Sequence, residues 1–123
     1  MISKCTELPK TLQEWFNVAW RHAVVEKNPP SFKMDSGKKI CLYRGPNDTC
    51  CLIGAGIPDS LYNSEMEGKA VLSVMGTFGI DIKGLRALQS IHDTFCRDSD
   101  YPEKIEMYLR NYASQYELEI PEN

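Results

Sequence analysis

One β-hairpin pattern interrupts a chain whose other apolar residues recur at helical spacing. Residues 40–44 and 50–54 are short apolar runs, and turn formers dominate residues 45–49 between them. An isolated hairpin is only marginally stable in water, so this one must pack on helices. The sequence therefore predicts a small α+β domain that is mostly helical, with one β-hairpin at about residues 40–54.

Capping signals and apolar stripes mark the helices. Thr11 and Glu14 have the Ser/Thr-x-x-Glu spacing of a capping box, and so do Ser64 and Glu67. The first apolar stripe runs until two prolines follow Asn28, where a helix must stop. We expect about four helices packed with the hairpin, at about residues 11–28, 64–76, 82–97 and 101–117. Residues 29–39 are rich in Pro, Ser, Gly and Lys and predict an exposed loop.

The length and the composition indicate one soluble domain. A chain of 123 residues with 42% hydrophobic and 25% charged residues is expected to fold as a single domain, 1–123, without metal or disulfide. It has no apolar run long enough to span a membrane, and residues 1–10 lack a signal-peptide core. Five cysteines, an odd number, favour free thiols in a reducing compartment. We therefore expect a cytoplasmic protein that does not bind membranes.

The net charge argues against general nucleic-acid binding. The formal charge is -3, whereas binding through phosphate contacts needs a basic domain. The charge is uneven, because residues 1–46 hold eight Lys and Arg against four acidic residues, and residues 98–123 hold two against seven. Most of these charges are expected on solvated helix faces, with weak attraction between the two ends. A local basic patch remains an open alternative.

The hairpin has a sulfur-rich face in the register that we expect. A three-residue loop would place Tyr43 opposite Cys51 and Cys41 opposite Ile53. The open edge of such a hairpin is an available docking site for a partner strand.

Cysteine and histidine supply the types of residue found in a zinc site. His92 and Cys96 are four apart on a predicted helix, so their side chains share a face. The remaining ligands would come from Cys41, Cys51 or its neighbour Cys50, and the chain lacks the tight Cys-x-x-Cys knuckle of structural zinc sites. Because free cysteine behaves as a small hydrophobe, buried thiols are the favoured interpretation. We predict neither a metal nor another cofactor.

A catalytic interpretation lacks a local signature. A nucleophilic thiol needs a nearby base, and Cys41 or Cys51 with His22 or His92 supplies the residue types only. The His92-Asp93 pair would orient an imidazole, but it equally describes a packed helix histidine. We therefore assign no catalytic residue and expect no enzyme.

A binding surface is the favoured functional interpretation. Arginine and tyrosine are enriched where proteins make energetic contacts, and the hairpin and the following loop carry Tyr43, Arg44 and Tyr62. The acidic side chains of that loop have a simpler interpretation, because carboxylates stabilise the N-terminal ends of helices. The predicted binding residues are Tyr43, Arg44, Asp59, Tyr62, Glu67, His92 and Asp93.

Several short motifs resemble a family of small uncharacterised proteins from phages, prophages and bacteria. The motifs have the form Cys-x-Tyr-Arg-Gly-Pro from Cys41, Ile-Pro-Asp-x-x-Tyr from Ile57, and Gln-x-Ile-His-Asp from Gln89. The resemblance runs from the first helix to Pro121. Family members often have a further cysteine where this chain has Ala55, and a basic residue at position 50. The resemblance implies an accessory protein of the bacterial cytoplasm and supplies no reaction.

Three functional hypotheses follow. The leading one is a small accessory binding protein that modulates or inhibits a host or phage protein, for instance a defence component. The alternative is a nucleotide-binding or sequestering protein that forms a homo-oligomer, because a monomer of this size rarely encloses a ligand. The third is an enzyme that uses Cys51 or His92.

Overall fold

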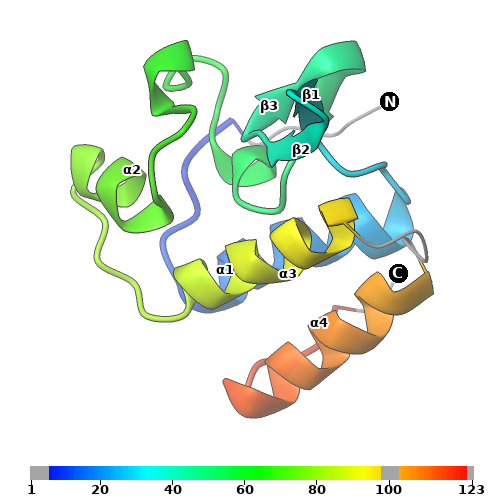
Figure 1. Ribbon diagram of the computed structural model, residues 1–123. Coiled ribbons are helices and arrows are strands. Elements are labelled where there is room, and N and C mark those ends of the chain that lie inside the picture. Colours follow the sequence, from blue (N-terminus) through cyan, green and yellow to red (C-terminus); the bar gives the residue numbers. More distant parts are fainter. Residues whose placement is uncertain (1–5, 98–102, 122–123) are drawn as a thin grey trace.

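A computed structural model describes residues 6–97 and 103–121 of the chain, and it has the predicted mostly helical α+β architecture (Figure 1). Four α-helices and two short antiparallel strand pairs form the described part. The helices are α1 (Leu12–Trp20), α2 (Val71–Thr77), α3 (Leu85–Arg97) and α4 (Glu103–Gln115). The strands are β1 (Phe32–Asp35), β2 (Lys38–Cys41), β3 (Arg44–Gly45) and β4 (Thr49–Cys50).

The first helix begins and ends close to its predicted bounds. Thr11 Oγ1 accepts a hydrogen bond from the Glu14 N–H at 3.1 Å, as expected for the cap residue. The Glu14 carboxylate accepts from the Lys10 N–H, one residue earlier than a capping box requires. After Trp20 the helix continues as a π-helical turn, Arg21–Val25, and it ends before the two prolines.

The predicted hairpin forms in the expected register but is short. Arg44 pairs with Cys50, and the Cys51 N–H donates to the Tyr43 carbonyl oxygen at 3.2 Å. Pairing stops there, because the chain then turns into a 3₁₀ turn, Gly54–Gly56. Cys41 therefore does not face Ile53.

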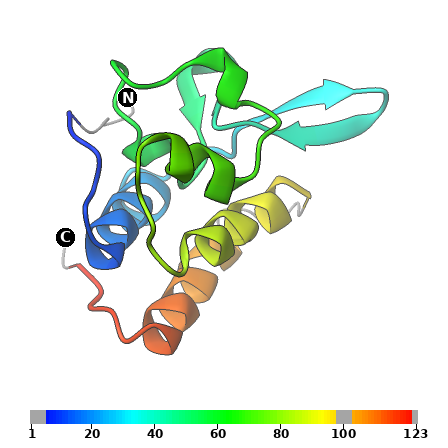
Figure 2. The ribbon, with the colours of Figure 1, turned by 90° about the vertical axis from the view of Figure 1, so that its left-hand side faces the viewer.

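A second hairpin, β1–β2, replaces most of the loop that we expected at residues 29–39. Cys41 pairs with Phe32 in this hairpin. Its turn residues, Ser36 and Gly37, have φ angles of 53° and 80°, the left-handed values that a tight two-residue hairpin turn requires. The hairpin projects from the body of the molecule beside α3 (Figure 2).

The predicted second helix is shorter than expected at its start. Residues Ser64–Met66 form only a 3₁₀ turn, and α2 begins at Val71. Gly68 lies between them with a φ of 82°, which an α-helix does not accommodate. The expected start of the fourth helix, around Asp100 and Pro102, lies outside the described residues.

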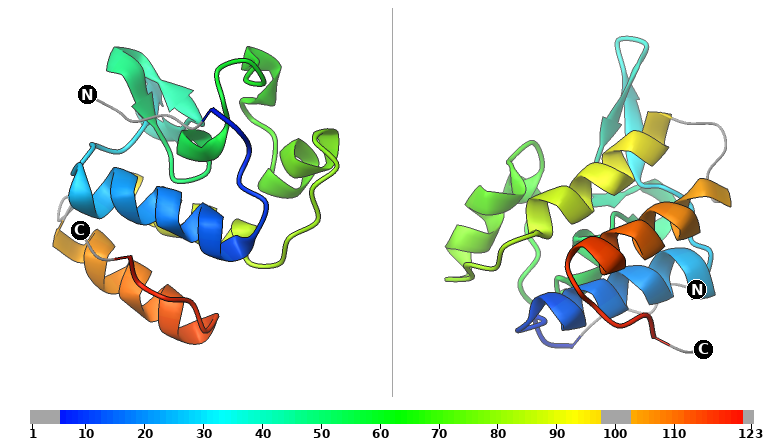
Figure 3. Two further views of the ribbon diagram at one scale, coloured as in Figure 1. Left: turned by 180° about the vertical axis from the view of Figure 1, so that it is seen from behind. Right: turned by 90° about the horizontal axis from the view of Figure 1, so that it is seen from below.

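The core lies between α1, α3 and α4 on one side and the segment that follows β4 on the other (Figure 3). Its fully buried side chains include Trp15 and Phe16 of α1, Leu88 of α3 and Leu109 of α4. Leu52, Ile53 and Ile57 complete it from the segment after β4. In the described part of the chain, every helix is too short or too polar to cross a membrane.

Candidate functional site

Five of the predicted binding residues gather around one carboxylate. Glu67 Oε1 accepts a hydrogen bond from the Tyr43 backbone N–H at 2.8 Å. Its Oε2 accepts from the Arg44 N–H at 3.0 Å and from the Tyr62 hydroxyl at 2.6 Å. Burial, and then this bond to Glu67, raise the pKa of Tyr62 to about 12, so the hydroxyl remains a donor at neutral pH. We call Tyr43, Arg44, Asp59, Tyr62 and Glu67 the Glu67 network.

The Arg44 guanidinium completes this network from within the molecule. It donates to Asp59 Oδ1 at 2.5 Å and to the Ile57 carbonyl oxygen at 2.6 Å. It also stacks on the Tyr62 ring, 4.6 Å from the ring centroid. The Arg44 side chain is only 16% exposed. Arg44 and Tyr62 therefore fasten the loop after Ile57 to β3, and they do not form a free contact surface.

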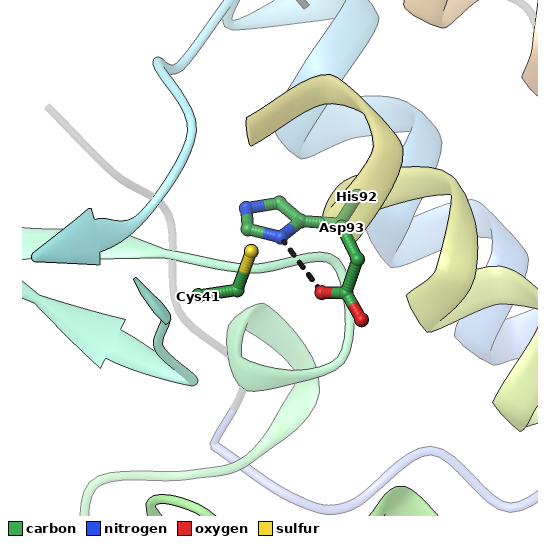
Figure 4. A group of neighbouring side chains, drawn as sticks. All are labelled: Cys41, His92 and Asp93. Atoms are coloured by element: carbon green, nitrogen blue, oxygen red, sulfur yellow. Dashed lines mark ion pairs between the residues drawn. The ribbon is translucent and has the colours of Figure 1, made fainter. Parts of the chain in front are cut away.

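The other two predicted binding residues, His92 and Asp93, lie beside Cys41 (Figure 4). The Cys41 sulfur, a His92 ring nitrogen and an Asp93 carboxylate oxygen all lie within 4.8 Å of one another. His92 is buried, and its Nε2 lies 3.1 Å from the Ser31 backbone N–H, which donates to it. Its Nδ1 lies 3.8 Å from Asp93 Oδ1, which also accepts from the Gln89 amide.

These contacts assign the tautomer of His92. Since Nε2 accepts from Ser31, the proton of the neutral ring is on Nδ1, which lies 3.8 Å from Asp93 Oδ1. A protonated Nδ1 has no lone pair for a zinc ion and cannot remove a proton from the Cys41 thiol. The geometry therefore favours His92 as a hydrogen-bond donor toward this group.

The sulfur atoms of Cys50 and Cys51 do not join this group. Cys51 is completely buried, its sulfur accepts from the Gly54 N–H at 3.1 Å, and burial raises the pKa of its thiol to about 12. Cys50 is 1% exposed, and its backbone carbonyl accepts from His22. The Cys96 side chain lies outside the described residues. Cys51 is thus a packed thiol rather than a nucleophile.

A cavity of about 510 Å³ opens next to Cys41. It lies between β2, the segment before α2, and α3, and its lining includes cationic side chains from all three. We call it the basic cleft and define it by Lys39, Cys41, Lys69, Val71, Arg86 and Asp93. Lys39, Lys69 and Arg86 are exposed, and Asp93 is the only acidic residue among the lining residues.

The Glu67 network supports one wall of the basic cleft. The Tyr43 backbone N–H donates to Glu67 Oε1, and the Tyr43 hydroxyl donates to the Lys69 carbonyl oxygen at 2.6 Å. Burial raises the pKa of Tyr43, so this donor also persists at neutral pH. The predicted residues thus position Lys69, which the sequence did not single out. The excess of positive charge in residues 1–46 hinted at Lys39 only.

Comparisons with protein families, curated proteins and solved structures found no match for this chain.

Proposed function

We propose that this protein is a small accessory binding protein of the phage or prophage type, which modulates or inhibits a host protein in the cytoplasm and carries out no reaction. The basic cleft is its contact site, and the partner presents an acidic segment there. One observation carries the proposal: cationic side chains from three separate segments converge on one cavity with a single acidic neighbour. Electrostatic complementarity of this kind selects partners and speeds association.

The charges of the basic cleft are available to a ligand. Within residues 6–94 and 104–121, neither Lys69 nor Arg86 has a side-chain ion pair. The Lys39 ammonium lies over the Phe32 ring, 4.8 Å from its centroid, and the residue is exposed. An acidic partner segment would therefore gain new ion pairs and would not have to break existing ones.

Apolar surface beside these charges favours a protein partner. Met34 is 60% exposed and is the cross-strand partner of Lys39, so both lie on the same face of the hairpin. Ile40 is 38% exposed and lines the cleft itself. Interfaces combine an apolar centre with charges at the rim, and the hairpin and cleft offer this combination.

Charge-reversal variants inside and outside the cleft test the proposal. Lys39→Glu and Arg86→Glu place a negative charge in the cleft, whereas Lys10→Glu makes the same change on an exposed lysine that does not line it. We expect the wild type and Lys10→Glu to retain the same protein from a bacterial lysate. The retained protein is then purified. The two cleft variants should bind it at least about tenfold more weakly than the wild type does. Equal retention by all four proteins would contradict the cleft as the contact site.

A second candidate, a nucleotide-sized anionic ligand, is favoured by the volume of the cleft. A cavity of about 510 Å³ lies within the usual range of small-molecule sites, and one chain forms it without a second subunit. A native mass spectrum of the untagged protein distinguishes the candidates. A bound small anion that disappears in Arg86→Glu would support this alternative, and a bare monomer would favour the protein partner.

A further inference from the structure

We propose that Cys41 is a modification site, at which an anionic low-molecular-weight disulfide forms a mixed disulfide and closes the basic cleft. The regulatory consequence rests on the proposed function, whereas the thiol chemistry rests only on the geometry of the cleft. Two features carry the chemistry. Cys41 is the accessible cysteine among those whose side chains are described, and three cationic side chains line the same cavity.

Accessibility separates Cys41 from its neighbours in the sequence. Cys41 is half-buried and lines the cleft, whereas Cys50 and Cys51 are 1% and 0% exposed. Thiols react as thiolates from partly exposed, electropositive surroundings, and buried structural thiols are inert. The raised pKa of Cys51, about 12, adds to this contrast. The chain thus contains its own internal controls for the reactivity of Cys41.

The surroundings of Cys41 favour an anionic reagent. Lys39, Lys69 and Arg86 line the same cavity, and their positive charges attract a carboxylate-bearing disulfide. The Asp93 carboxylate, which lies within 4.8 Å of the Cys41 sulfur, is the one acidic group among the lining residues. The balance in the cleft is positive.

The step is a thiol–disulfide exchange. The Cys41 thiolate attacks one sulfur of the incoming disulfide, a new S–S bond forms, and the original S–S bond breaks. The leaving thiolate takes up the equivalent of the proton that Cys41 lost, so one small thiol is released for each adduct. Cys41 is oxidised and the incoming disulfide is reduced. A thiol in excess reverses the step, as expected for a switch in a reducing compartment.

The adduct would occupy the place of the partner segment. Its carboxylates would lie beside Lys69 and Arg86, the two side chains that we propose to bind the acidic segment of the partner. Modification would therefore lower the affinity for the partner by competition for these two side chains and by filling the cavity.

The experiment measures modification of the isolated full-length protein, so it does not depend on a partner. Oxidised glutathione is the anionic probe, and 2-hydroxyethyl disulfide is an uncharged probe of the same chemistry. Peptide mapping by mass spectrometry gives the rate at each cysteine. We expect Cys41 to react with oxidised glutathione at least about tenfold faster than Cys50 or Cys51 in the folded protein.

Charge variants test the electrostatic part. Lys69→Gln with Arg86→Gln should slow the reaction of Cys41 with oxidised glutathione by roughly threefold to tenfold, and by more than the reaction with the uncharged disulfide. Lys10→Gln, at an exposed lysine that does not line the cleft, should change neither rate. An unreactive Cys41, or equal slowing with both probes, would overturn the proposal. That result would leave the lysate experiment above intact, so the two failures are distinguishable.

Discussion

Replacement of Glu67 by glutamine tests whether the Glu67 network holds the cleft together. The carboxylate accepts from two backbone N–H groups and one hydroxyl, at distances of 2.6–3.0 Å. A glutamine amide offers only one oxygen, and its NH₂ group must then face the N–H of either Tyr43 or Arg44. In both orientations of the amide one backbone donor loses its acceptor.

The expected cost follows from these bonds. A half-buried donor without an acceptor costs about 1–3 kcal/mol, and the remaining bonds weaken because the acceptor is no longer charged. We expect Glu67→Gln to lower the free energy of unfolding by about 3 kcal/mol, which corresponds to a decrease in Tm of roughly 10 °C for a chain of this length.

The assay is urea unfolding followed by the fluorescence of the buried Trp15 and Trp20. Glu65→Gln is the matched control, because it makes the same change on an exposed side chain two residues away. The control should stay within about 0.5 kcal/mol of the wild type. If the two variants differ from each other by less than this amount, the network does not stabilise the fold and our account of the cleft wall is wrong.

Two further predictions concern stability elsewhere in the chain. A Cβ on Gly54 would overlap the Tyr43 carbonyl oxygen, whereas one on Gly76 meets no atom within 4 Å. Thermal unfolding should therefore show a loss of about 3 kcal/mol or more for Gly54→Ala and a gain of about 0.5–1 kcal/mol for Gly76→Ala; a tolerated Gly54→Ala would refute this packing. Burial lowers the pKa of His22 below its usual 6.5. Near and below pH 6.5 the unfolded chain therefore binds a proton that the folded chain does not, and stability should fall as the pH decreases from about 7. Urea unfolding at several pH values should give a smaller acid-side decrease for His22→Gln, whose amide can still donate to Cys50 O; an unchanged slope would exclude His22 as the cause.

Local signals predicted the positions of the helices, and residue type predicted the members of the Glu67 network as a binding surface. Thr11 and the two prolines after Asn28 are capping and breaking residues whose effect is set by their immediate neighbours. The hydrogen bonds that join Arg44 and Tyr62 to Glu67 were not part of that prediction. The sequence did not predict where these side chains point. Arg44 turns inward to Asp59 and Ile57, which residue type alone does not indicate.

Features that depend on distant parts of the chain escaped the sequence. The strand β1 alternates apolar and polar residues, but it is only four residues long and three of them are exposed, so the pattern does not stand out from a loop. The Ser36–Gly37 turn is the other local signal of this hairpin. The tautomer of His92 depends on the Ser31 N–H, 61 residues away. Cys41 and His92 were weighed as candidate zinc ligands and not predicted to bind a metal, and the Ser31 N–H bears on what this pair can do because it fixes the proton position on His92.

The fold places cationic side chains around one cleft, although the chain as a whole is acidic. Within residues 104–121 no acidic side chain lines the basic cleft, because α4 packs against α1, α3 and the π-helical turn, and Glu106 of α4 pairs there with Arg110. The cleft is lined instead by Lys39, Lys69 and Arg86. A partner that approaches this face encounters positive charge, although the whole chain carries a formal charge of -3. The net charge therefore describes solubility, and the local charge of the cleft determines which ligand is attracted.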